Sequence, residues 1–346
     1  MLETIWQTLL QTPNYLFDAN KRIFIGYSIA ALVIAMLLYF SGRAQQKKRT
    51  WRGLGRYLFS KRIWLSKSAK LDYQLLIINR LLKAALWVPI VLTMVPVAIG
   101  VSDALQWLFG ERAVWQLPST VVLVIFTVLL FIFDDLTRFL LHLALHKVPF
   151  LWHFHKVHHS ALVLTPMTIY RSHPFESYLY ACRMALAQGF VVGVCVYCFG
   201  RNLSMLDILG ANVFVFAFNA LGANLRHSHV WWSFGKKIEN WLISPAQHQI
   251  HHSDNPKHFD RNLGSALAIW DRACGTLIKA HQVGKITVGV GNNDRGHNSV
   301  MDAYWRPIYE NLQTPWQRVA KAANKVNVFN KKKPIIEVNI NDKTVK

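Results

Sequence analysis

The sequence is short of acidic residues. Its 346 residues include 18 Asp and Glu against 39 Lys and Arg, so the formal net charge is +21. Nucleic-acid binders share such an excess, but they have no need of the long apolar runs found here, where 52% of residues are hydrophobic. We therefore expect no nucleic-acid partner. Contact with anionic lipid headgroups and the cytoplasmic bias of bases in membrane proteins explain the charge.

Cysteine is also scarce, and its four positions exclude a disulfide framework. Cys195 and Cys198 form a CxxC inside an apolar run, without a second such pair. We interpret them, with Cys182 and Cys274, as small residues rather than a zinc or redox site. The first 22 residues mix acids, bases and apolar residues, and they lack the pattern of a secretory signal peptide.

Several catalytic and cofactor motifs are missing from the sequence. There is no His-Glu-x-x-His of zinc proteases, no phosphate-binding loop and no Gly-x-Ser-x-Gly. No flavin, nicotinamide or haem motif is visible either.

Long apolar runs are what the sequence has in abundance, and they predict membrane helices. Two runs cover Ile23 to Phe40 and Ala84 to Val101. A third covers Thr120 to Phe133 and continues toward Leu145, interrupted by Asp134, Asp135 and Arg138. Two more, Met184 to Phe199 and Leu203 to Leu221, predict a tight helical hairpin that dips into or crosses the membrane. We predict an all-α integral membrane protein with four to five transmembrane or re-entrant helices.

The loop after the first run sets the predicted orientation. Ser41 to Lys70 holds ten bases and no acid, so the positive-inside rule places it in the cytoplasm. Counting spans from this loop puts every histidine-rich segment on the cytoplasmic side. The membrane would be the inner membrane in a bacterium and the endoplasmic reticulum in a eukaryote. Docking of an acidic redox partner is a second interpretation of the loop, besides contact with water or lipid.

Histidines recur at spacings that place them on one face of a helix. One H-x3-H motif and two H-x2-H-H motifs occur, and residues at i, i+3 and i+4 share a helix face. Imidazole binds iron, zinc, copper and nickel, and one zinc ion takes three or four protein ligands. Eight clustered imidazoles therefore predict two metal ions. The eight are His142, His146, His155, His158, His159, His248, His251 and His252.

These motifs and their flanks resemble the fatty acid hydroxylase/sterol desaturase superfamily of membrane di-iron oxidases. The resemblance covers residues 135–276, about 40% of the chain, and rests on five segments. They are Asp135-Leu-Thr-Arg-Phe-Leu-Leu-His142, Leu151-Trp-His-Phe-His155-Lys-Val-His158-His159, Arg171-Ser-His173-Pro174-Phe-Glu176, Ser244-Pro-Ala-Gln-His248-Gln-Ile-His251-His252 and Asn262-Leu-Gly264 followed by Trp270-Asp271.

The resemblance implies two further metal ligands, His173 and His227, in the same cytoplasmic, histidine-lined helical cap. His229 is implied as a weaker ligand or a supporting group with a role in catalysis. Asp135 is a candidate acceptor that fixes the tautomer of an imidazole, with an ion pair to Arg138 as the alternative.

Four other residues complete these expectations. Glu176 and Asp271 are each expected either to accept a hydrogen bond that fixes the tautomer of an imidazole or to form an ordinary ion pair. His281 and His297 are expected to play no part in the site.

The implied function is a di-iron oxidase that uses O2 to hydroxylate or desaturate a lipid, such as a sterol or a fatty acyl chain. The implied cofactor is a pair of iron ions, and the implied partners are the lipid, O2, the membrane and an external electron donor, which is a cytochrome, ferredoxin or reductase. A histidine-rich metal transporter is one alternative, although transporters place polar groups at the bilayer midplane. A non-catalytic relative that keeps its metals as scaffold is the other.

Three regions are expected along the chain. Residues 1–112 form an N-terminal membrane region with two spans and the basic loop. Residues 113–285 form a catalytic domain like that of the fatty acid hydroxylases. Residues 286–346 form a polar C-terminal tail, whose segment Lys331-Lys332-Lys333-Pro334 introduces its last part.

Overall fold

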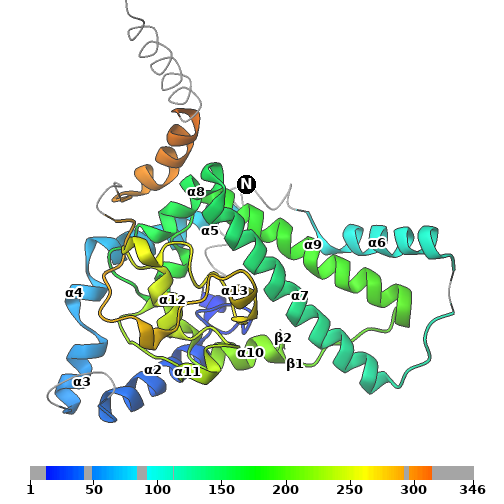
Figure 1. Ribbon diagram of the computed structural model, residues 1–346, viewed down its shortest axis with the longest axis horizontal. Helices are drawn as coiled ribbons and strands as arrows, with labels where there is room; N and C mark the ends of the chain where they lie inside the picture. Colours follow the sequence, from blue (N-terminus) through cyan, green and yellow to red (C-terminus); the bar gives the residue numbers. More distant parts are fainter. Residues whose placement is uncertain (1–12, 43–48, 84–91, 112, 292–295, 314–346) are drawn as a thin grey trace, which may run out of the picture.

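The computed structural model describes residues 13–42, 49–83, 92–111, 113–291 and 296–313 (Figure 1). These residues are mostly helical, which confirms the predicted helical class. The described strands, β1 (Asp207–Ile208) and β2 (Ala211–Asn212), pair as a short antiparallel ladder. The predicted tail segment Lys331 to Pro334 lies outside the described residues.

Two long helices form the spine of the molecule. Helix α7 (Ser119–Lys147) and helix α9 (Pro174–Phe199) lie side by side in opposite directions (Figure 1), and Phe133 stacks on Phe190 between them. Both helices are long and apolar enough to cross a membrane. The predicted run from Thr120 to Leu145 is thus confirmed as one helix.

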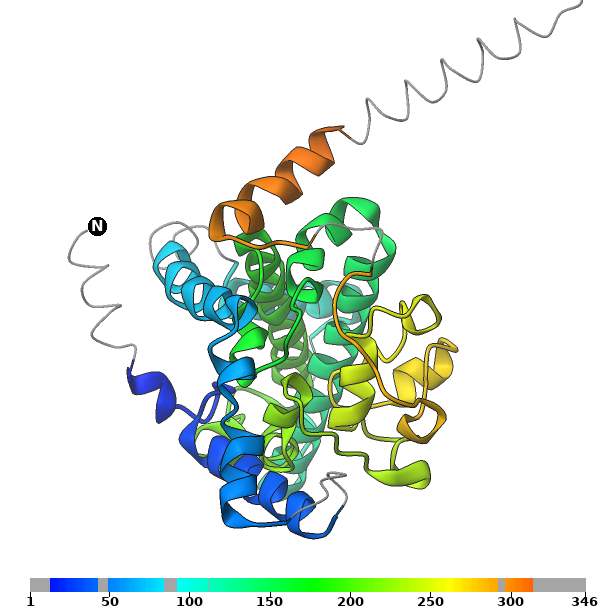
Figure 2. The same cartoon turned by 90° about the vertical axis from the view of Figure 1, so that its left-hand side faces the viewer.

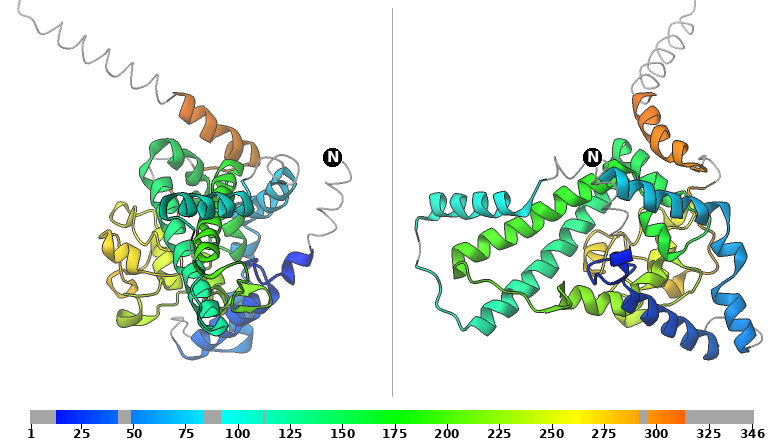
Figure 3. Two further views of the ribbon diagram at one scale, coloured as in Figure 1. Left: turned by 90° about the vertical axis from the view of Figure 1, so that its right-hand side faces the viewer. Right: turned by 180° about the vertical axis from the view of Figure 1, so that it is seen from behind.

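Helix α6 (Met94–Phe109) packs closely along α9, as Figure 3 shows. A Cβ atom at Gly189 would lie 2.8 Å from the carbonyl oxygen of Met94, and one at Gly193 would lie 2.6 Å from that of Ala98. Only glycine therefore permits this contact, which is the small-xxx-small pattern of helix pairs in membranes. The predicted span Ala84 to Val101 begins outside the described residues, and the observed helix extends beyond its end.

The predicted helical hairpin is wrong in its second arm. Helix α9 contains the first arm, but Leu203 to Leu221 holds a loop, the β1–β2 turn and the eight-residue helix α10 (Val213–Ala220). Gly210 takes a positive φ of 77° in the turn, and the Asn212 side chain caps α10 by accepting from the amide of Phe214 at 3.0 Å. Helix α10 then contacts α2 and α7.

The N-terminal elements pack around the histidine-bearing part of the chain. They are η1 (Pro13–Leu16), α2 (Ile25–Phe40), α3 (Trp51–Leu58), α4 (Lys61–Trp64) and α5 (Lys67–Leu82). The first predicted run is confirmed as a helix in α2, which is shorter than a full span at 16 residues. Leu54 and Leu58 of α3 pack with Leu225 and Val230, on either side of His227.

The remaining elements are short and gather where α7 ends and α9 begins. Figure 2 shows α3–α5 on one side of the α7–α9 pair and residues 240–290 on the other. Residues 300–313 are also helical, and Ala303 packs there against Leu71 and Val157. The short elements are α8 (Pro149–His159), η3 (Pro166–Tyr170), η4 (Ala223–His227), α11 (Gly235–Ile238), α12 (Pro245–His251), η5 (Pro256–His258), α13 (Ile269–Ala273) and η6 (Ala280–Gln282).

Candidate metal centre

Nine histidines converge in two neighbouring groups, within each of which the ring nitrogens lie within 4.8 Å of one another. The five-histidine group comprises His142, His146, His155, His159 and His251. The four-histidine group comprises His158, His227, His248 and His252. The structure therefore brings together all eight motif histidines and one of the two ligands implied by resemblance. That these residues bind metal stays a prediction.

The five-histidine group draws its side chains from α7, α8 and α12. The Nε2 atoms of His142 and His155 lie 3.2 Å apart. The Nε2 atoms of His146, His159 and His251 are buried without a hydrogen-bond partner in the described part of the chain. A buried polar atom without a partner is costly, and a shared cation satisfies all of these nitrogens at once.

The four-histidine group is centred on His227, the last residue of η4. Its Nε2 atom lies 3.1 Å from the Nε2 atoms of His248 and His252 and 3.3 Å from that of His158. Two nitrogens at right angles around one ion, each about 2.1 Å from it, lie about 3.0 Å apart. The spacing of the four nitrogens thus fits a single ion.

Helix periodicity explains why the motifs divide between the groups as they do. In α8, His155 and His159 lie one turn apart on one face, whereas His158 is rotated away from His159 and points toward His227. In α12, His251 joins the five-histidine group, and His248 and His252 join the other. Each H-x2-H-H motif therefore supplies both groups, which holds the two metal positions next to each other.

Hydrogen bonds fix several of the rings with Nε2 directed inward. His142 Nδ1 donates to the carbonyl oxygen of Leu263 at 2.7 Å, and His251 Nδ1 donates to that of Arg261 at 2.8 Å. His155 Nδ1 lies 3.0 Å from Glu176 Oε1. A donated Nδ1 proton leaves Nε2 unprotonated, which is the tautomer that binds metal.

Two weaker contacts extend this pattern. His146 Nδ1 lies 3.3 Å from Asp260 Oδ1, and His158 Nδ1 lies 3.3 Å from the carbonyl oxygen of Arg171. Sequence reasoning found neither Asp260 nor the carbonyl groups at 261 and 263. Only the resemblance of Asn262-Leu-Gly264 drew attention to this loop.

Burial keeps these imidazoles neutral. It lowers the pKa of His155 and of His158 to about 3. Burial and neighbouring histidines also hold the pKa of five further histidines well below the usual range: His159, His227, His248, His251 and His252. Neutral imidazoles are the form that binds metal, so the two groups can bind metal without first losing protons.

Asp135 has neither of the roles predicted for it. Its carboxylate accepts from the amides of Ala266 and Leu267 at 2.7 and 3.0 Å and from the indole of Trp270 at 2.9 Å. It therefore fixes the loop that carries Leu263, the acceptor for His142. The predicted ion-pair partner, Arg138, instead binds Asp134 at 2.7 Å.

Asp271 acts on the same loop. It accepts from the amides of Leu263 and Gly264 at 2.9 and 2.7 Å and from the Thr276 hydroxyl. Among the three carboxylates considered from sequence, only Glu176 contacts a histidine of the two groups in the described chain. The prediction that a carboxylate fixes an imidazole is thus met by Glu176.

His173 lies outside both groups, contrary to the prediction from resemblance. Its Nδ1 accepts from the amide of Phe175 at 3.0 Å, and its Nε2 donates to the carbonyl oxygen of Tyr304 at 3.2 Å. The residue thus caps α9, which begins at Pro174. Both ring nitrogens have partners, so neither is free to bind metal.

The remaining histidines lie apart from the groups. His229 packs edge-on against Tyr57, with ring centroids 4.8 Å apart, so its implied role as a ligand has no geometric support. His281 is exposed, and His297 is buried. Neither of these two belongs to a group, in agreement with the expectation.

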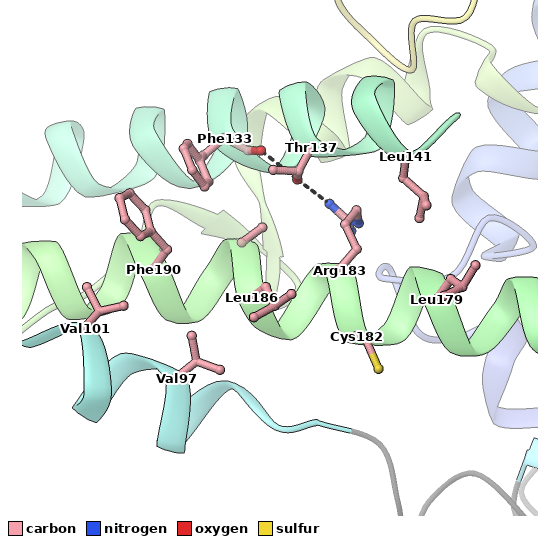
Figure 4. Close-up of a pocket in the computed structure, with 11 residues that line it drawn as sticks. Val97, Val101, Phe133, Thr137, Leu141, Leu179, Cys182, Arg183, Leu186 and Phe190 are labelled. Carbon is pink, nitrogen blue, oxygen red and sulfur yellow. Dashed lines mark hydrogen bonds between the residues drawn. The ribbon is translucent and has the colours of Figure 1, made fainter. Parts of the chain in front are cut away.

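An apolar groove runs between α6, α7 and α9, with a volume of about 510 Å³ (Figure 4). One end is lined by Phe133 and Phe190, and the other by Leu141 and Leu179. Leu141 directly precedes His142, and Leu179 lies three residues after Glu176. The groove therefore ends within about one helical turn of the five-histidine group.

The known proteins that resemble this chain match it over the part that carries the histidine groups. Residues 127–276 match the family model described as fatty acid hydroxylase. Alkylglycerol monooxygenase of Caenorhabditis elegans is 23% identical over 54% of this chain and 32% of its own length. Ornithine lipid hydroxylase OlsE of Rhizobium tropici is 28% identical over 44% of this chain and 41% of its own length. Cholesterol 25-hydroxylase of Homo sapiens is 30% identical over 45% of this chain and 52% of its own length.

The matched region lies within the predicted catalytic domain, residues 113–285, whose boundaries stay a prediction. The chain spans between 32% and 52% of the length of these three relatives. No solved structure matches the chain significantly.

Proposed function

The chain belongs to the fatty acid hydroxylase superfamily through residues 127–276, and on this premise we propose that it is an integral membrane di-iron enzyme that uses O2 to oxidise a lipid. The observation that carries the proposal is the pair of histidine groups, in which nine ring systems from α7, α8, η4 and α12 converge. An all-nitrogen set of this size fits two redox-active ions that keep positions open.

Two iron ions, when bound, would supply the O2 activation needed to break an unactivated C–H bond. The protein contributes the rest. Leu263, Arg261 and Glu176 hold imidazoles with Nε2 inward. Seven of the nine histidines are buried, which keeps bulk water from the reacting position.

The apolar groove supports a lipid as the substrate. It lies between helices that are long or apolar enough to sit in a membrane, and it ends beside His142. A hydrocarbon chain bound there would reach the five-histidine group without entering water. The names of the relatives, a monooxygenase and two hydroxylases, favour hydroxylation over desaturation for this chain.

The membrane assignment rests on α7 and α9, together with the shorter apolar helices α2 and α6. We propose that the histidine groups face the cytoplasm, because the basic segment 41–70 carries no acid and packs, through Leu54 and Leu58, beside His227. Cysteines placed at Arg52 and at His258 should both react with an impermeant maleimide only from the cytoplasmic side. Labelling from opposite sides would contradict this orientation.

A metal transporter is disfavoured by the position of the histidines. They lie where α7 ends and α9 begins, whereas a transport site needs polar groups near the middle of its spans. A non-catalytic metal-binding relative has the same geometry, so turnover alone separates it from an enzyme.

The proposal is tested by comparing the lipids of cells that express the chain or its His158→Ala variant under isotopically labelled O2. We expect a lipid that gains one labelled oxygen atom, or one that loses two hydrogen atoms, only with the intact chain. His281→Ala is the matched control, because His281 is exposed and lies outside both groups. Identical lipids from the intact chain and from His158→Ala would contradict the proposal.

A further inference from the structure

Four arginines from separate elements lie near one another beside the histidine groups. Arg22 precedes α2, Arg138 and Arg183 belong to α7 and α9, and Arg226 belongs to η4. Arg22 lies within electrostatic range of Arg138 and Arg226, and Arg138 lies within range of Arg183. Guanidinium groups repel one another, so such a cluster requires negative charge nearby.

The cluster borders the metal centre on more than one side. Arg138 precedes His142 by one helical turn and lies on the same face of α7, with about 5–6 Å between such Cβ atoms. Arg226 directly precedes His227, and Arg22 lies within electrostatic range of His227. Whatever neutralises these arginines is therefore a neighbour of the histidines.

The carboxylates near the cluster already have partners. Asp134 binds Arg138 at 2.7 Å and Arg183 at 2.8 Å. Asp135 accepts the three hydrogen bonds of the 266–270 loop, and Glu176 holds His155. These carboxylates leave no ion pair for Arg22 or Arg226 in the described part of the chain.

The two remaining arginines differ in their surroundings. Arg226 is 4% exposed, donates to the carbonyl oxygen of Ser265 and lies over the ring of Phe218, and its Nε has no partner among the described residues. Arg22 is half-buried, and the structure shows it no hydrogen bond or salt bridge within the described ranges. Asp135 lies within electrostatic range of both arginines but forms an ion pair with neither in the described part of the chain. Arg22 is thus the arginine of the cluster without a hydrogen bond or ion pair among the described residues.

One arginine of the cluster is partly accessible. The side chain of Arg138 keeps 39% of its surface accessible despite its bond to Asp134. Tyr170 lies within electrostatic range of Arg22, and burial raises the pKa of its phenol to about 12. Its hydroxyl therefore stays protonated and can donate a hydrogen bond alongside the arginines.

We propose that Arg22 and Arg138 bind an oxyanion, a phosphate or carboxylate, carried by the lipid that the metal centre oxidises. Guanidinium groups recognise such oxyanions through paired, charge-assisted hydrogen bonds. The inference rests on the proposed function for the identity of the lipid as substrate. It adds the chemical class of the substrate, an anionic lipid.

The position of the anchor also sets which carbon reacts. An oxyanion held at Arg138 lies about one helical turn from His142. Carbons close to the anionic group, rather than those at the end of the hydrocarbon chain, then lie against the histidines. The remainder of the chain can extend along the apolar groove, away from the metal centre.

The test measures binding by the purified full-length protein in neutral detergent. The two probes are a lysophosphatidic acid and the monoacylglycerol with the same acyl chain. We expect the anionic probe to bind at least about tenfold more tightly, as charge-assisted hydrogen bonds to a guanidinium predict. Arg22→Gln and Arg138→Gln should each reduce this preference to less than about threefold. The exposed Arg201→Gln is the matched control and should keep it.

Arg22→Gln is the decisive variant, because the substitution breaks no hydrogen bond shown among the described residues and should fold normally. Equal affinity for the two probes, or an unchanged preference in Arg22→Gln, overturns the proposal. Competition with inorganic phosphate distinguishes a site for an anionic lipid from a site for free phosphate. If it displaces the anionic probe at similar concentration, the site takes free phosphate and the lipid assignment fails.

Metal content and turnover are measured on the same samples, so the two proposals fail separately. Loss of the preference in Arg22→Gln with metal content unchanged supports the oxyanion site. Preference for the anionic probe in a protein without metal or turnover contradicts the di-iron enzyme but leaves the oxyanion site supported. Turnover of the monoacylglycerol in preference to the anionic probe contradicts the oxyanion site alone.

Discussion

The two histidine groups differ in how their rings are held. In the five-histidine group, four Nδ1 atoms have acceptors outside the group: Leu263, Asp260, Glu176 and Arg261. In the four-histidine group, only His158 has such an acceptor in the described structure, and the Nδ1 atoms of His248 and His252 are buried without one. One group is therefore oriented by hydrogen bonds, and the other mainly by packing.

The difference teaches that the two metal positions need not be equivalent. A ring that donates from Nδ1 to a fixed acceptor presents Nε2 in one tautomer and one direction, so less conformational entropy is lost when metal binds. We expect the five-histidine group to hold its ion more tightly. The four-histidine group should depend more on His227, which lies at the centre of its contacts.

The largest expected effects come from two separate variants, each of which removes one ligand from one of the groups. His142→Ala and His248→Ala should each lower metal content from about two ions per chain to about one and reduce turnover by more than about a hundredfold. Elemental analysis and lipid product formation measure these effects. The ion that remains in His248→Ala should resist a chelator longer than the one that remains in His142→Ala. The reverse order would contradict the comparison, and His281→Ala serves as the control.

The next effect tests the hydrogen bonds themselves. Glu176→Gln weakens the acceptor of His155 Nδ1, so metal affinity in the five-histidine group should fall by about 10- to 100-fold. The four-histidine group should be unaffected. In a chelator titration of the purified variant, one metal ion should therefore be released at a lower chelator concentration than in the unsubstituted protein, and the other at the same concentration. Glu111→Gln, an exposed substitution of the same type, should leave both releases unchanged.

Acidification should affect both groups alike, because burial rather than hydrogen bonding lowers their pKa values. The pKa of His155 and of His158 is about 3 in the folded chain and about 6.5 when unfolded. On acidification these histidines bind protons in the unfolded chain before they do so in the folded chain. The free energy of unfolding of the metal-free protein is therefore highest above about pH 6.5. It falls as pH drops toward 3, by about 1.4 kcal/mol per pH unit for each such histidine. Thermal unfolding at pH 7.5, 6.5 and 5.5 measures this, and a constant Tm would refute it.

The smallest effect is expected from His229→Ala. This ring packs on Tyr57 and lies outside both groups, so metal content should stay near two ions and turnover should fall by less than about threefold. His227→Ala, two residues away, should behave like the loss of any other ligand in its group. If His229→Ala lost a metal ion and His227→Ala did not, the assignment within the four-histidine group would be wrong.

Local periodicity made much of the metal centre predictable. The spacings at 142–146, 155–159 and 248–252 lie within single helices, where three or four residues make one turn, and the structure gathers all eight side chains. The outer contacts were not predictable in this way. Asp260 and Leu263 approach His146 and His142 from positions more than 110 residues away in the sequence, which spacing cannot reveal.

Two wrong predictions had local signals that were available. His173 precedes Pro174, and proline at the first position of a helix marks the preceding residue as its cap. Leu203 to Leu221 is apolar overall, but Asp207, Gly210 and Asn212 interrupt it with residues that favour turns and caps. In both cases one to three residues that favour turns or caps determined the backbone more strongly than average hydrophobicity or motif resemblance did.

The two groups draw their histidines from α7, α8, η4 and α12, and this division also imposes an order in time. His142 is synthesised 109 residues before His251, which takes about 5–20 s at the usual rates of translation. During this interval the ribosome has delivered the histidines of α7 and α8, but not the helix that completes either cage. Partial sets of imidazoles bind copper and zinc more strongly than iron. An ion that entered while α12 was still being made would thus be selected by an incomplete set of imidazoles.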